Sequence, residues 1–197
     1  MTATFDLTSA ERDIRTAEAF TTTLRADGMT KTPVTYLDFT VDGAPLFPQL
    51  ASRASGGLDF VGVIQEAWPI ETVAAIQRLV GADEGDLPDG RLSLYVCPEC
   101  GDLGCGAVTA TLSVNPETVT WGAIGWQADY DEEVSALGDD GVFPDLTFTR
   151  SSYEAALLPM LAKMRPLADE FEYPYQRERR QRRDRLTGHL RRFFPHR

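Results

Sequence analysis

Residues 91–126, RLSLYVCPECGDLGCGAVTATLSVNPETVTWGAIGW, hold the clearest structural signal in the chain. Runs rich in β-branched and aromatic residues at 91–96, 107–114 and 118–126 are separated by a cysteine- and glycine-rich bend and by a short turn at 115–117. Such runs between turn signals predict strands, and consecutive strands joined by short connections form an antiparallel meander. The stretch therefore predicts a sheet whose first bend carries the cysteines.

Helix signals lie on both sides of this meander. Thr8 or Ser9 ahead of Glu11 is typical of an N-cap and predicts a helix from about residue 8 to 25. Residues 71–81 have the apolar spacing of an amphipathic helix, and the capping pattern at 151–154 predicts another, kinked or ended at Pro166. The predicted class is α+β: an antiparallel β-meander sheet packed with about three helices.

Composition and charge divide the chain into two parts. Its 197 residues are 43% hydrophobic and 25% charged, which is normal for a globular domain. Residues 173–197 contain nine Arg against two carboxylates, a net charge of +7, whereas residues 1–172 carry ten Lys or Arg against 28 Asp or Glu, a net charge of −18. We expect one α+β domain over 1–172 and a basic, helical C-terminal extension over 173–197.

The extension has a narrow apolar stripe among its arginines, formed by Leu186, Leu190, Phe193 and Phe194. We expect its Phe end to dock on the acidic body, within one chain or between subunits of a homo-oligomer. Binding of nucleic acid or of an anionic membrane surface is the alternative. The acidic body opposes nucleic-acid binding, since a phosphate backbone is attracted by positive charge.

The opening residues and the apolar runs bear on location. MTATFDLTSAERDIR is acidic and polar where a secretory signal would need a basic flank and an apolar stretch. No apolar run approaches the roughly 20 residues that a transmembrane helix needs. The expected location is the cytoplasm, where a framework of structural disulfides is disfavoured.

The bend at 97–106 contains all three cysteines of the chain. Cys97-Pro98-Glu99-Cys100-Gly101 resembles the metal knuckles of zinc ribbons and rubredoxins, in which two thiolates two residues apart converge on one ion. Cys105 could bend back as a third ligand of Zn²⁺. A closed zinc site takes four ligands, and Asp102, Glu99 or a water could complete this one. The only histidines, His189 and His196, lie in the basic extension.

Other interpretations of the bend remain open. Its thiols could be small buried packing groups, because cysteine is among the most buried residue types. Cys-Pro-x-Cys also resembles the glutaredoxin active site, but the glycines that follow leave no helix N-terminus to activate a thiol. An iron–sulfur cluster would usually take a fourth cysteine. A dinucleotide fingerprint requires a helix after the glycines, whereas a strand is predicted here.

The run YVCPECGDLGCGAVTATL (95–112), with VTW shortly after it, resembles a motif in a family of uncharacterised bacterial proteins. Members of that family share a cysteine- and glycine-rich bend between two strands. The resemblance extends over about residues 91–126, and more loosely into FTRSSYEAAL and the Arg-Arg-aromatic ending. It implies that these residues act together, and it implies no activity.

The sequence favours a non-catalytic cytoplasmic protein over an enzyme. It contains a metal knuckle without an accompanying nucleophile, base or cofactor fingerprint. An acidic surface suits a basic protein partner, with the cysteine bend as a structural or partner-presenting element that holds Zn²⁺. The alternative is a metal-dependent enzyme in which Cys97, Cys100 and Cys105 hold zinc, water takes the open position, and Glu99 or Asp102 acts as acid or base.

Overall fold

The computed structural model describes residues 2–17, 29–54, 58–138 and 143–181. These residues form two antiparallel sheets and several helices, which confirms the predicted α+β class. One sheet has the order β1 (Phe5–Ala17), β2 (Met29–Val41), β3 (Ala44–Pro45). The other has the order β4 (Val61–Gly62), β5 (Leu92–Val96), β6 (Ala107–Val114), β7 (Thr118–Gln127), β8 (Leu146–Thr149). The labelled helices are α1 (Leu46–Ala51), α2 (Pro69–Leu79) and α3 (Arg150–Glu170), and residues 174–181 form a further helical segment.

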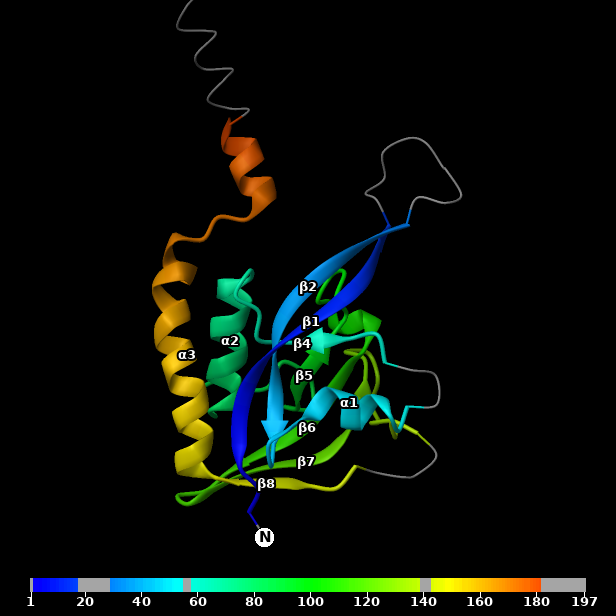
Figure 1. Ribbon diagram of the computed structural model, residues 1–197, viewed down its shortest axis with the longest axis vertical. Coiled ribbons are helices and arrows are strands. Elements are labelled where there is room, and N and C mark those ends of the chain that lie inside the picture. The colour runs from blue at the N-terminus through cyan, green and yellow to red at the C-terminus, as the bar shows by residue number, and fades with distance from the viewer. Residues whose placement is uncertain (1, 18–28, 55–57, 139–142, 182–197) are drawn as a thin grey trace, which may run out of the picture.

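Two isolated bridges join the three-stranded sheet and the segment before it to the two edges of the five-stranded sheet, next to β4 and at β8. The Leu37 N–H donates to the Ile64 carbonyl at 2.8 Å, and the Ala3 N–H donates to the Thr147 carbonyl at 2.7 Å. The strands therefore wrap around one shared core. Figure 1 shows α2 and α3 side by side along one side of the strands, with α1 on the other side.

The predicted meander is confirmed, and so are two of the predicted helices. β5, β6 and β7 follow one another in the sheet, with the cysteine bend between the first two. The amphipathic segment at 71–81 corresponds to α2, and the segment after residue 150 corresponds to α3. Pro166 does not end α3, because the helix continues to Glu170. Its N-cap is Thr149, whose hydroxyl accepts from the Ser152 N–H.

The predicted helix over 8–25 is wrong for the residues that the structure describes. β1 pairs with β2 in continuous register from Phe5 opposite Val41 to Ala17 opposite Met29, and residues 18–25 lie outside the described part. Cross-strand pairing and the burial of Phe5 outweigh the local capping signal at Thr8 and Ser9, because helix propensity is worth only tenths of a kcal/mol per residue. The structure contains a different third helix, the short α1.

A cluster of aromatic rings fills the core between β7, β8 and α3. Trp121, Phe148 and Tyr153 are fully buried, and Phe5 packs against all three rings. The Trp121 indole N–H donates to the Tyr153 hydroxyl at 3.0 Å, and that hydroxyl donates to the Leu79 carbonyl at 3.0 Å. These bonds satisfy the buried polar groups and fix the seam between α2, α3 and the sheet.

Asp38 on β2 is a buried carboxyl beneath α1. It accepts from the Tyr95 hydroxyl at 2.5 Å and from the Phe47 N–H at 3.3 Å. Burial raises the pKa of Asp38, and the hydrogen bonds from Tyr95 and Phe47 oppose that shift. The folded protein therefore holds a proton on Asp38 at pH values where the unfolded chain has released it.

We expect Asp38 to make the protein less stable as the pH rises. Because the folded pKa lies above the ordinary value of 3.8, stability is fully present below that value and is lost as pH increases through the raised pKa. Urea unfolding of wild type and Asp38→Asn between pH 3 and 8 measures this. The free energy of unfolding of wild type, minus that of the variant, should fall across the window. A difference that rises with pH would contradict it, and Asp83→Asn, at an exposed position, controls for the loss of one carboxylate.

The C-terminal extension begins on the body of the protein. The Tyr173 hydroxyl donates to Glu71 at 2.7 Å, its ring packs edge-on against Phe171, and residues 174–181 are helical. The predicted apolar stripe and both histidines lie outside the described residues, so docking of the Phe end and the division at 172/173 stay predictions. Among the described helices, none is long and apolar enough to cross a membrane.

Candidate metal centre

The cysteine bend connects β5 to β6 through two successive tight turns. β5 is buried along its whole length and delivers the chain to Cys97. The Gly101 N–H donates to the Cys97 carbonyl at 2.9 Å, and a short 3-10 turn, Leu103–Cys105, follows. The Asp102 carboxylate caps this turn by accepting from the Gly104 N–H at 2.8 Å. The pairing of Val96 with Ala107 then closes the bend.

These turns bring the three sulfurs together. The Sγ atoms of Cys97, Cys100 and Cys105 all lie within 4.8 Å of one another, and those of Cys100 and Cys105 are 3.5 Å apart. The Asp102 N–H points at the Cys100 sulfur at 3.4 Å, as expected of a knuckle. Tetrahedral coordination with Zn–S bonds of about 2.3 Å separates sulfurs by about 3.8 Å. The three cysteines are therefore close to the spacing at which they could hold one metal ion.

The exposure of the thiols excludes the interpretation that all three are buried packing groups. Cys97 is half-buried, whereas Cys100 and Cys105 are exposed. The hydrogen bond with Cys100, followed by the charges of Cys100 and Cys97, raises the pKa of Cys105 to about 11. The positive charge of a bound cation would offset the repulsion between the thiolates. Thiols that coordinate a metal ion are for this reason deprotonated.

The structure does not bring a fourth protein ligand to the sulfurs among the residues that it describes. Asp102, the candidate from sequence, caps the 3-10 turn instead of joining the group. Glu99 is exposed on the first turn, and His189 and His196 lie outside the described part. Asp102 as a ligand stays a prediction, and the arrangement at hand is three sulfurs with an open side.

Trp126 stands next to the bend because β7 contains a bulge. Thr109 pairs with Gly125 and Thr111 with Gly122, so β7 has one extra residue between them, and Ala123 takes a positive φ of 48°. A regular strand would place Trp121 and Trp126 on opposite faces, but the bulge brings both to the same face. Trp121 is fully buried, whereas Trp126 is half-buried and lies against Gly106 at the end of the bend.

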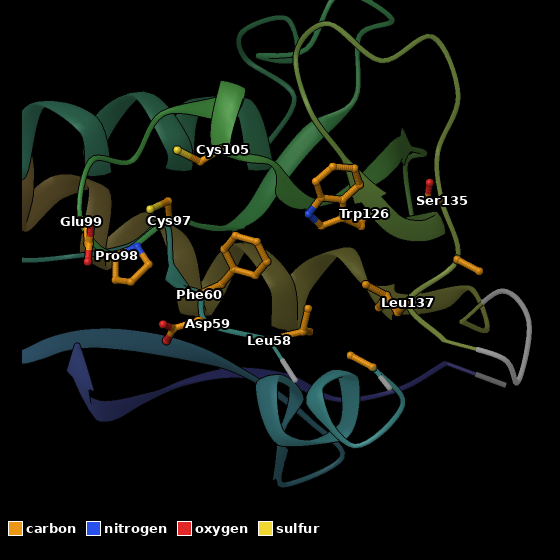
Figure 2. A pocket seen from close by; sticks show the side chains of 12 residues that line it. Leu58, Asp59, Phe60, Cys97, Pro98, Glu99, Cys105, Trp126, Ser135 and Leu137 are labelled. Atoms are coloured by element: carbon orange, nitrogen blue, oxygen red, sulfur yellow. The ribbon is translucent and has the colours of Figure 1, made fainter. Parts of the chain in front are cut away.

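A pocket of about 540 Å³ opens beside the sulfurs. Figure 2 shows Cys97, Cys105 and Glu99 at one end, with Asp59 below Cys97, and Trp126, Ser135 and Leu137 at the other end, with Phe60 and Leu58 between them. Of these residues, the sequence analysis predicts a role for the cysteines and Glu99. It missed the other walls, because 58–60 and 135–137 carry no motif and meet the bend only in the folded chain.

In comparisons with family models, with curated proteins and with solved structures, the chain finds no match. The resemblance to the bacterial family with a cysteine-and-glycine bend therefore rests on the motif alone.

Proposed function

We propose that the protein binds one thiophilic metal ion, with Zn²⁺ as the first candidate, through Cys97, Cys100 and Cys105. The observation that carries this proposal is the convergence of three Sγ atoms within 4.8 Å of one another on a single bend. Thiolates select soft and borderline ions such as zinc over Mg²⁺ or Ca²⁺. Thiols that stay reduced fit a cytoplasmic protein, which is part of the proposal.

The ion would act first on the shape of the bend. The first turn is held to β5 by its hydrogen bond to Cys97, and the second leads into β6, so an ion between Cys97, Cys100 and Cys105 would lock one turn to the other. The rigid corner would present its surface to a protein partner. A partner with a basic surface fits the net charge of −18 on residues 1–172. In this form the protein is non-catalytic.

An enzyme is the second candidate, and the pocket beside Cys97 and Cys105 favours it. Catalytic zinc sites hold the ion with three protein ligands and leave the fourth position to water, whose pKa the metal lowers to about 7. Glu99 lines the same end of the pocket and is a carboxylate that could take part in proton transfer. Asp102 suits this role less, since its carboxylate caps the 3-10 turn.

Metal analysis of the full chain, purified without chelator, tests the metal site. We expect one equivalent of zinc and three thiols protected from Ellman's reagent, all three becoming reactive after EDTA treatment. Asp102→Asn should keep one equivalent, because the Asn oxygen can still accept from the Gly104 N–H. Three freely reactive thiols without metal would contradict the proposal, and loss of zinc in Asp102→Asn alone would identify Asp102 as the fourth ligand.

A further inference from the structure

The pocket beside the sulfurs has walls that are formed without a ligand. The Arg12 guanidinium donates to the carbonyls of Leu58 and Phe60 and pairs with Asp59 at 3.2 Å, so β1 holds this segment in place. Across the pocket, Trp126 and Ser135 exchange two backbone hydrogen bonds of 2.8 Å. A site with prearranged walls loses less entropy when a ligand enters it.

The volume and lining of the pocket suit a small ligand or a short side-chain cluster. A volume of about 540 Å³ lies within the roughly 300–1,000 Å³ typical of ligand sites. Away from the sulfurs the lining is mainly apolar: Ala54, Leu58, Phe60, Trp126, Ala136 and Leu137. Polar groups are few there, which is the distribution found in sites that bind an apolar body and orient it from one polar end.

The cysteine end fixes the chemistry of the ligand head. Three thiolates around a divalent ion leave a net charge of −1, and the Glu99 carboxylate lines the same end. This charge repels a second anion and favours a neutral donor. A neutral imidazole nitrogen meets that condition, and it completes the Cys₃His set that zinc uses in structural sites.

We infer that the pocket binds a ligand in which a neutral imidazole stands beside an apolar or aromatic group. The imidazole nitrogen takes the open position on the metal, and the apolar group lies against Phe60, Trp126 and Leu137. A histidine next to an aromatic residue in a partner peptide has this chemistry, and so does a free aromatic imidazole. The inference rests on the proposed metal site and names what fills its open side.

The test uses the full chain loaded with Co²⁺ at pH 8, where thiolate-to-cobalt absorption reports the sulfurs and the d–d bands report the fourth ligand. We expect 1-benzylimidazole to bind roughly tenfold more tightly than imidazole, because the benzyl group adds apolar burial. Acetyl-His-Phe-amide against acetyl-His-Gly-amide forms the peptide arm. If the dipeptide amides bind more tightly than the free imidazoles, the ligand is a partner peptide, and the reverse order identifies a free aromatic imidazole. Equal affinities within both pairs would overturn the inference.

A variant separates the pocket from the metal. Ala136 is an exposed lining residue, so Ala136→Glu should fold and should place a charge among the apolar walls. It should reduce the benzyl preference to below about threefold, while the thiolate-to-cobalt band keeps its intensity. Ala82→Glu, at an exposed position outside the pocket lining, should keep the full preference. Absence of the thiolate-to-cobalt band in wild type would contradict the metal site itself, whereas a normal band without any preference contradicts only the pocket.

Discussion

Serine at any one of positions 97, 100 and 105 is expected to lower the zinc affinity by at least about a hundredfold. Each cysteine supplies one of three protein donors, and a neutral serine hydroxyl is a much poorer ligand than a thiolate. The three variants Cys97→Ser, Cys100→Ser and Cys105→Ser should therefore lose the ion to a chromophoric chelator that wild type resists. Because two of the thiols are exposed, the metal-free variants should keep the fold of metal-free wild type.

Glu99→Gln is the matched control for these variants, since it changes a charged side chain on the same turn without removing a sulfur. It should keep the affinity within about threefold, as expected for an exposed side chain that is not a ligand. If one Cys→Ser variant bound zinc as tightly as wild type, the site would use only two sulfurs. Circular dichroism of each metal-free variant shows whether any loss comes from unfolding.

Alanine at Gly106 is expected to destabilise the protein by at least about 3 kcal/mol. Gly106 has φ 85° and ψ 158°, a region that is essentially restricted to glycine. A Cβ there would also lie 2.3 Å from an atom of the Trp126 ring, well inside van der Waals contact. Both costs are present without metal, so urea unfolding in the presence of chelator measures them.

Gly101→Ala is the control for this prediction, because it shares the positive φ without the steric contact. Its φ is 65°, and no heavy atom lies within 4 Å of the Cβ position. The expected cost is about 1 kcal/mol, the penalty of a left-handed conformation alone. Equal costs at the two glycines would mean that the Trp126 ring moves aside, and a change in its near-ultraviolet dichroism would accompany that outcome.

Local signals were enough for the meander and for two helices. The strands before and after the cysteine bend are rich in β-branched residues and bounded by turn residues, and α2 repeats its apolar residues at helical spacing. They were not enough for β1, where Thr8, Ser9 and Glu11 look like a helix start. That segment is a strand because β2 pairs with it, and β2 begins only at Met29.

The spacing of Cys97, Cys100 and Cys105 on a tight bend confines their sulfurs to a small volume, so the order of residues is enough to identify the atoms available for coordination. What surrounds these atoms depends on contacts that exist only in the folded chain. A single bulged residue at Ala123 turned Trp126 toward the bend, and the Arg12 hydrogen bonds held Phe60 opposite it. The two differ in the separation along the chain over which they act. A backbone turn depends on a few neighbouring residues, whereas a pocket wall depends on contacts between segments that meet only after the sheets have formed.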